Sequence, residues 1–132
     1  MDNRNILIVD DMRTIRLKLR KICTDIGIKT IFEAGDGNEA YEVLRNFNID
    51  LVLSDWNMPN LTGIELVKKM RETPKMADLP VIFITSETEK GAILESLQHG
   101  ITDYVVKPFA DDTVRAKILG VLNSQSKIQA KA

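Results

Sequence analysis

The sequence predicts an α/β protein with one domain, built on a doubly wound sheet of five parallel strands. Five short apolar segments alternate along the chain with five segments in which apolar residues recur at helical spacing. Four of the apolar segments end on polar side chains, which meet at one edge of a sheet when its strands are parallel. At 132 residues, the chain is long enough for one such domain and leaves little for a second.

The composition argues against several classes of protein. Hydrophobic residues make up 44% of the chain, and the 18 basic and 19 acidic side chains nearly balance. A formal net charge of -1 gives no electrostatic reason to expect a nucleic acid or a membrane as partner. The single cysteine forms no internal disulfide, no apolar run approaches the ~20 residues of a membrane span, and residues 1–4 lack a signal-peptide pattern. We therefore expect a cytoplasmic protein that is a monomer.

The five strands are predicted from short runs of aliphatic and aromatic residues. The first, third and fourth runs are almost continuously apolar, as in strands that are buried on both faces of a sheet. The second run alternates weakly, which suits a half-covered strand near an edge, and the fifth leads into a lysine and a proline. In chain order, the predicted strands cover residues 5–10, 29–34, 49–55, 79–85 and 103–109.

The first three helices are predicted from apolar residues repeated every three to four positions. The first carries Cys23 on its apolar side, where a packed and inert thiol is expected, and Arg20 on the side that faces away. Asn38 is the predicted cap of the second helix. Thr62, with Glu65 three residues later, predicts a capping box at the start of the third.

The last two predicted helices are less regular than the first three. The fourth has a short apolar stripe of Ile93, Leu94 and Leu97 and contains Gly91, so we expect it to be the most loosely held. The fifth is followed by a polar tail, which we expect to be frayed. In chain order, the predicted helices cover residues 12–26, 38–47, 62–73, 89–99 and 112–123, and the domain and its tail cover residues 1–125 and 126–132.

The predicted strand ends carry a set of polar side chains that parallel topology would bring together. Taken singly, an aspartate or threonine at a strand end more often shapes a turn, and a lysine there is more often solvated. Their convergence at one edge favours a functional site. The set consists of Asp10 and Asp11 after the first strand, Asp55 at the end of the third, Thr85 at the end of the fourth and Lys107 in the fifth.

This set of residues suits the chemistry of phosphoryl transfer. Three carboxylates in close contact repel one another, and Mg²⁺, which prefers oxygen ligands, relieves that repulsion. The loop signature of a calcium site is absent from the sequence. A carboxylate such as Asp55 can act as a nucleophile and form an aspartyl phosphate, while a metal ion, Lys107 and the Thr85 hydroxyl hold the transferring oxygens.

Four motifs resemble the response-regulator receiver family in their order and spacing: Asp10-Asp11, residues 55–59, Thr85-Ser86 and residues 104–109. The similarity spans nearly the whole domain and is greatest to single-domain chemotaxis receivers of the CheY type. The resemblance implies a flavodoxin-like sheet with the strand order 2-1-3-4-5. It also implies a cis peptide bond between Lys107 and Pro108.

The resemblance further implies which residues accept the phosphoryl group and hold the metal. Asp55 would accept a phosphoryl group from the phosphohistidine of a histidine kinase. Mg²⁺ would be bound by Asp10, Asp11, Asp55 and the backbone carbonyl of Asn57, directly or through water.

The other implied roles concern the response to phosphorylation. Thr85 and Lys107 would contact the phosphoryl oxygens, and Tyr104 would change rotamer as Thr85 moves. Asn57 and Glu87 would tune the rate at which the phosphoryl group is lost. The signal is expected to leave through residues 89–99, the strand around Tyr104 and the last helix.

The resemblance implies a phosphorylation-activated response regulator of a two-component system, with chemotaxis as its pathway. Its only chemistry would be its own phosphorylation and dephosphorylation, so it would not be a metabolic enzyme. The implied partners are a histidine kinase, a downstream target such as the flagellar motor switch, and a phosphatase. A receiver module of another two-component pathway, such as a phosphorelay, is the alternative.

Three other classes of protein fit the sequence less well. A transcription regulator would need a DNA-binding domain after Asn123, and a phosphatase with an aspartyl nucleophile usually has a second acid where Asn57 stands. A flavodoxin-type cofactor binder would have a glycine-rich loop after the first strand. His99 precedes Gly100 at a predicted helix end, where an imidazole suits the helix dipole, so we expect the donor histidine on a partner.

Overall fold

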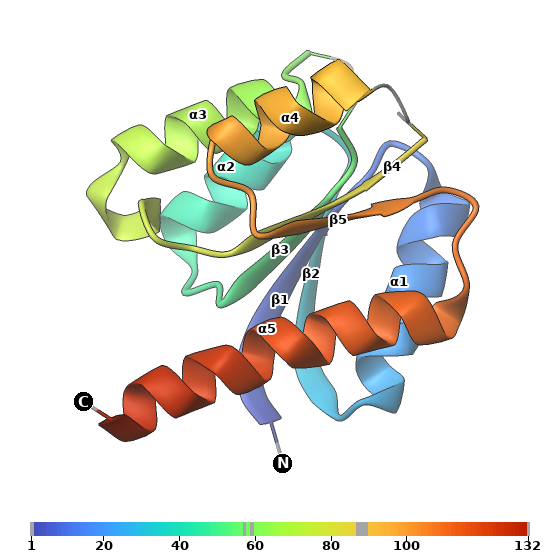
Figure 1. Cartoon of the computed structure of the whole chain (residues 1–132), viewed down its shortest axis with the longest axis vertical. Helices are drawn as coiled ribbons and strands as arrows, with labels where there is room; N and C mark the ends of the chain where they lie inside the picture. The colour runs from blue at the N-terminus through green and yellow to red at the C-terminus, as the bar shows by residue number, and fades with distance from the viewer. Residues whose placement is uncertain (1, 57, 59, 87–89, 132) are drawn as a thin grey trace.

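A five-stranded parallel sheet forms the centre of the molecule, with helices covering both of its faces (Figure 1). The computed structural model describes residues 2–56, 58, 60–86 and 90–131. The strand order β2-β1-β3-β4-β5 confirms the predicted fold class and strand order. The elements are β1 (Asp2–Val9), α1 (Arg13–Asp25), β2 (Ile28–Ala34), α2 (Gly37–Asn46), β3 (Leu51–Ser54), α3 (Gly63–Glu72), the 3₁₀ turn η1 (Pro74–Met76), β4 (Val81–Thr85), α4 (Lys90–Gln98), β5 (Asp103–Val106) and α5 (Asp111–Lys131).

The sheet separates two layers of hydrophobic core. In β1, Leu7 and Val9 pack into the cluster formed with α2 and α3, whereas Ile6 and Ile8 pack into the cluster formed with α1 and α5. Successive residues of a strand point to opposite faces, and here both faces are covered. This explains why the central strands are continuous apolar runs in the sequence.

Helix α1 buries the side that its apolar spacing predicts. Leu19, Ile22 and Cys23 are all at most 1% exposed. Burial raises the pKa of the Cys23 thiol to about 12, and this effect outweighs the opposing charge of Arg20. A thiol with that pKa stays protonated near neutral pH, so the prediction of a packed and inert cysteine is confirmed.

The starts of α2 and α3 test two predicted caps. The prediction for α2 is wrong, since Asp36 is its cap and accepts a hydrogen bond of 2.8 Å from the Glu39 amide, whereas Asn38 lies inside the helix. Asp36 has the extended backbone that a capping residue needs. For α3 the predicted capping box is confirmed, because Thr62 and Glu65 each accept a hydrogen bond from the other's amide, at 3.2 and 3.0 Å respectively.

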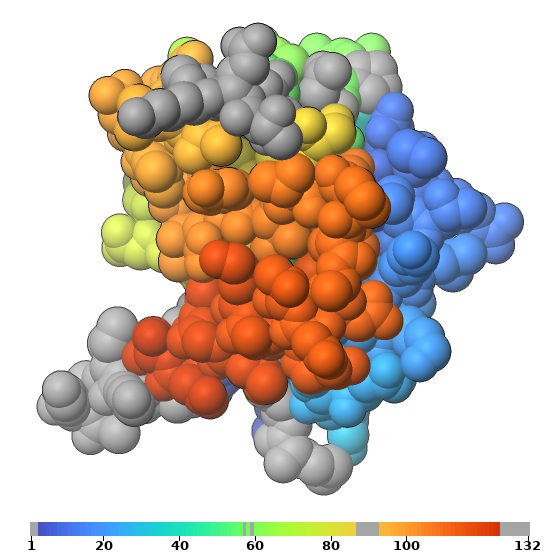
Figure 2. Space-filling view, turned by 45° about the vertical axis from the view of Figure 1, so that its right-hand side comes forward, coloured from blue at the N-terminus to red at the C-terminus, as the bar shows by residue number. Residues whose placement is uncertain are grey.

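Helix α4 does not bury the predicted stripe. Leu94 and Leu97 are 49% and 44% exposed, while Ile93 is half-buried and Ser96 is only 3% exposed. The inward side of α4 therefore follows the spacing of Ile93 and Ser96, and the two leucines point outward. Figure 2 shows α4, β5 and α5 together on one face of the molecule.

Helix α5 is longer than predicted. Its buried stripe consists of Val114, Ile118 and Leu122, and the helix continues to Lys131 instead of ending near residue 123. Residues 124–131 contain neither glycine nor proline, so a polar composition alone does not end the helix there. Neither α5 nor any other described helix is both long and apolar enough to cross a membrane.

Candidate functional site

Four strands deliver polar residues to the carboxyl edge of the sheet. Backbone hydrogen bonds hold these ends in place, since the Asp55 amide donates to the Val9 carbonyl at 2.9 Å and the Lys107 amide donates to the Thr85 carbonyl at 2.8 Å. The bonds extend the sheet register one residue beyond the strands. The residues concerned are Asp10 directly after β1, Asp55 directly after β3, Thr85 at the end of β4 and Lys107 directly after β5.

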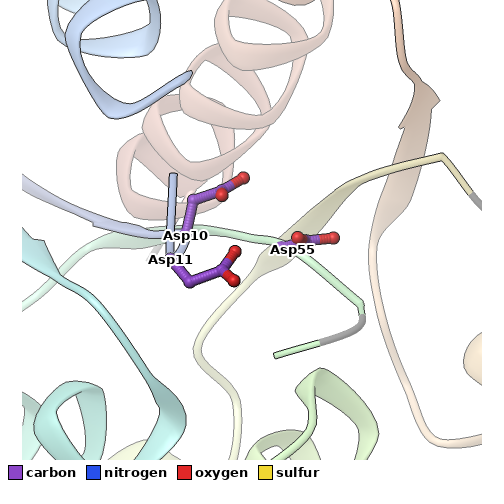
Figure 3. Close-up of side chains that lie close together, drawn as sticks. All are labelled: Asp10, Asp11 and Asp55. Atoms are coloured by element: carbon purple, nitrogen blue, oxygen red, sulfur yellow. The ribbon is translucent and has the colours of Figure 1, made fainter. Parts of the chain in front are cut away.

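Asp10, Asp11 and Asp55 form a compact carboxylate cluster (Figure 3). One oxygen of each side chain lies within 4.8 Å of one oxygen of each of the others. Asp10 is 0% exposed and Asp55 is 7% exposed, whereas Asp11 is open to solvent. The predicted convergence of these three residues is therefore present in the fold, with one side of the cluster accessible from outside.

Lys107 supplies a positive charge to this cluster. Its Nζ lies 2.9 Å from Oδ2 of Asp10 and 3.3 Å from Oδ2 of Asp55, and its side chain is only 15% exposed. Burial lowers the pKa of Lys107, but the hydrogen bond to Asp10 and the charge of Asp55 outweigh burial, so its pKa is raised. The ammonium therefore stays charged at neutral pH. One ammonium among three carboxylates leaves an excess of negative charge.

Thr85 ends β4 at the edge of the sheet that carries the cluster, and it lines a pocket with residues of α4. Its side chain is 4% exposed. This pocket is small, roughly 10 Å³, about the room that one water needs. A movement of the Thr85 side chain would therefore directly affect the residues that line this pocket under α4. The other residues lining the pocket are Trp56, Phe83, Ile93, Ser96, Ile101 and Tyr104.

The remaining sequence predictions have mixed outcomes. Asn57 and Glu87 lie outside the described residues, so their predicted roles stay predictions. The peptide bond between Lys107 and Pro108 is cis, as the resemblance implies. His99 directly follows α4 and lies near the amino edge of the sheet, since the amide of Thr102, three residues later, donates to the Val81 carbonyl at the start of β4. This position is consistent with its predicted place at a helix end.

Residues 6–119 match the response regulator receiver domain family. The chain belongs to this family. The match covers every strand end described above, and with them the carboxylate cluster.

Several proteins similar to this chain are chemotaxis proteins. The chemotaxis protein CheY of Pseudomonas aeruginosa is 40% identical over 113 residues, which are 86% of this chain and 91% of that protein. The solved chemotaxis response regulator CheY4 of Vibrio cholerae is 32% identical, with a TM-score of 0.85 over 91% of this chain and 99% of that one. The receiver domain of the histidine kinase PA1611 from Pseudomonas aeruginosa PAO1, solved with magnesium in its active site cleft, is 22% identical with a TM-score of 0.83, over 92% of this chain and 99% of that chain. The resemblance to CheY-type receivers is thus confirmed.

Gly63 is a site residue that the sequence analysis missed. It is the first residue of α3, and its amide donates to the Trp56 carbonyl at 2.9 Å. A Cβ at Gly63 would lie 2.5 Å from the Asp55 carbonyl oxygen and 3.0 Å from the Trp56 Cα, both in the backbone. Only a residue without a side chain lets α3 approach the backbone at Asp55 so closely.

The substitution Gly63→Ala is therefore expected to destabilise this receiver domain by about 1–3 kcal/mol, the usual cost of overpacking. The matched control is Gly120→Ala in α5, where nothing lies within 4 Å of an added Cβ. The control should be stabilising by roughly 0.5–1 kcal/mol, since alanine is the better helix former. Urea denaturation of both variants measures the difference, and equal stabilities would mean that the close approach at Asp55 is not tightly held.

Proposed function

We propose that this receiver domain is a phosphorylation-activated response regulator in which Asp55 is the phosphoacceptor. A bond forms between an Asp55 carboxylate oxygen and phosphorus as the phosphorus–nitrogen bond of a kinase phosphohistidine breaks. The observation that carries the proposal is the position of Asp55, which lies among Asp10, Asp11 and Lys107 at the carboxyl edge of the sheet.

Mg²⁺ is the proposed cofactor, bound by Asp10, Asp11 and Asp55, with the backbone carbonyl of Asn57 as a further ligand. The donor set fits, because three carboxylates within 4.8 Å of one another offer only the hard oxygen ligands that Mg²⁺ prefers. The bound ion would neutralise charge on the transferring oxygens. Magnesium in the cleft of the PA1611 receiver domain agrees with this assignment.

Lys107 and Thr85 are proposed to bind the phosphoryl oxygens, the lysine through its charge and the threonine through its hydroxyl. Both already lie at the edge that holds Asp55. Tyr104, which shares a pocket with Thr85, would then change rotamer and pass the signal to α4 and β5. Asn57 and Glu87 would tune the loss of the phosphoryl group.

The proposed pathway is chemotaxis in the cytoplasm, because the relatives at 40% identity are chemotaxis proteins named CheY. A monomeric domain would take its phosphoryl group from a histidine kinase, act on a target such as the flagellar motor switch, and be reset with the help of a phosphatase. A receiver of another two-component pathway would have the same site and a different target. Identifying the protein that binds the phosphorylated form would distinguish chemotaxis from another two-component pathway.

Labelling with a small phosphodonor tests the proposed chemistry. Incubation with acetyl phosphate is expected to add one phosphoryl group when Mg²⁺ is present and none in excess chelator, because the carboxylates otherwise repel the anion. Intact mass measures the addition. Asp55→Asn should remain unlabelled, while Asp103→Asn, whose aspartate pairs with Lys117 away from the cluster, should be labelled normally. Full labelling of Asp55→Asn, or equal labelling with and without metal, would refute the assignment.

A further inference from the structure

Arg16 on α1 connects the carboxylate cluster to strand β2. Its Nη1 donates a hydrogen bond to the main-chain carbonyl of Asp10, and its Nε lies 3.0 Å from Oε1 of Glu33. The side chain of Arg16 is 19% exposed and that of Glu33 is 27% exposed. One guanidinium therefore links the peptide between Asp10 and Asp11 to the neighbouring strand.

Glu33 is itself held by a second arginine. The Nε of Arg20 lies 2.7 Å from Oε2 of Glu33, and Arg20 also donates to the Ile31 carbonyl at 3.2 Å. Burial raises the pKa of Glu33, but hydrogen bonds and charge from Arg20 and Arg16 outweigh burial, so its pKa is lowered. The prediction that Arg20 faces away is wrong, because this arginine reaches back to β2. Both oxygens of Glu33 are thus occupied, and the orientation of Arg16 is constrained.

The contact with Arg16 completes the bonding of Asp10. The amide of Asp10 donates to the Ala34 carbonyl at 3.1 Å, its Oδ1 accepts from the Met12 amide at 2.9 Å, and its Oδ2 accepts from Lys107. With the carbonyl bound by Arg16, the Asp10 backbone is bonded at both its amide and its carbonyl, and Arg16 holds the peptide plane that leads to Asp11. Asp11 is exposed, so the backbone, through this peptide plane, sets where its side chain starts.

We propose that Arg16, oriented by Glu33 and Arg20, is a positioning residue that holds Asp10 and Asp11 in the arrangement that binds the divalent cation. The inference rests on the proposed function, since that function places Mg²⁺ at this cluster. Groups that orient metal ligands without touching the metal typically change metal affinity by roughly 10-fold or more when they are replaced.

Charge and positioning make opposite predictions for Arg16→Gln. The substitution removes a positive charge near a cation site, so charge alone would make Mg²⁺ bind more tightly. Loss of positioning would make Mg²⁺ bind more weakly, because the peptide before Asp11 loses the hydrogen bond that holds its carbonyl. The direction of the change in affinity therefore distinguishes the two effects.

The experiment is a calorimetric Mg²⁺ titration of the wild type and three variants. Arg16→Gln is expected to weaken binding by roughly 10-fold. Arg16→Lys keeps the charge but lacks the fork that reaches two acceptors at once, so it should recover only part of the affinity. Lys21→Gln removes the same charge from the exposed Lys21–Asp25 pair of α1 and should bind Mg²⁺ as the wild type does. Tighter binding by Arg16→Gln, or full recovery in Arg16→Lys, would overturn the proposal.

A metal-free measurement separates this inference from the proposed function. In excess chelator, Arg16→Gln should shift the amide signals of Asp10, Asp11 and Met12, and Lys21→Gln should not. If the wild type binds no Mg²⁺, the proposed metal site fails, and these amide signals decide the positioning role alone. If Arg16→Gln unfolds more easily in chelator yet keeps both the wild-type Mg²⁺ affinity and these signals, Arg16 is only structural and the proposal is wrong.

Discussion

Replacing Lys107 by alanine is expected to lower the free energy of unfolding by about 3–5 kcal/mol in metal-free buffer, because buried carboxylates lose their shared cation. The side chains of Asp10 and Asp55 are only 1% and 10% exposed, and Lys107 bonds both. A lysine at a strand end is ordinarily solvated, and its removal then costs little. Here the side chain is only 15% exposed, which makes the loss large. Urea denaturation in excess chelator measures it.

The matched control is Lys117→Ala, which removes another lysine that bonds an aspartate. Lys117 Nζ lies 2.9 Å from Oδ2 of Asp103, but the two side chains are 33% and 37% exposed. The expected loss is therefore only about 0–1 kcal/mol. Added Mg²⁺ should stabilise Lys107→Ala more than the wild type, because the metal then supplies the missing positive charge. Equal losses in the two lysine variants would show that the Lys107 pairs do not stabilise the fold.

The ion pairs of Lys107 with Asp10 and Asp55 also predict how the difference in unfolding free energy between the wild type and Lys107→Ala depends on pH. The pKa of Lys107 is raised above the ordinary lysine value of 10.5, so the folded state binds the proton more tightly than the unfolded state does. The stabilisation is therefore complete below that value and is lost as the pH rises through the raised pKa. The difference in unfolding free energy attributable to this lysine should stay constant between about pH 7 and 9 and shrink at higher pH.

The strands and most of the site could be predicted from the sequence for one physical reason. A strand covered on both faces must be apolar throughout, so the first polar residue after it marks the carboxyl edge of the sheet. Asp55 follows such a run after the small buried Ser54, Lys107 directly follows the half-buried β5, and parallel topology brings the two residues together although they are 52 positions apart. The expected convergence of Asp10, Asp11 and Asp55 needed no knowledge of side-chain packing.

The features that could not be predicted depend on geometry that leaves little trace in the sequence. Arg16 and Arg71 both donate to main-chain carbonyls; Arg71, for example, donates to the carbonyls of Leu79 and Gly100. Because every residue type has a main-chain carbonyl, such an acceptor leaves no mark in the sequence. The exposed leucines of α4 show the same limit. Leu94 and Leu97 fit a helical stripe, but a small rotation of the helix about its axis puts Ile93 and Ser96 inward instead.

Phosphorylation of Asp55 is expected to change the amide signals along α4 and β5 as well as those of the loops around the site. Thr85 connects the two regions, since it lies at the edge that holds Asp55 and also lines the pocket with Tyr104, Ile93 and Ser96. That pocket has room for about one water and not for a phenol ring. Inward movement of Tyr104 therefore requires α4 to shift, which links the ring to the helix.

The shift of α4 would change how the receiver domain presents Leu94 and Leu97, which are already 49% and 44% exposed. Two outward leucines on α4 suit a partner with an apolar helical face, bound more tightly after phosphorylation by a coupling of ~1–3 kcal/mol. Amide chemical shifts with and without a phosphoryl mimic provide the measurement. Thr85→Ala serves as the control: at mimic concentrations high enough to offset the lost hydroxyl, the mimic should still bind beside Asp55 and Lys107, while the changes along residues 90–104 are lost. Changes confined to the loops around Asp10, Asp55 and Lys107 in the wild type would mean that the signal does not leave through α4.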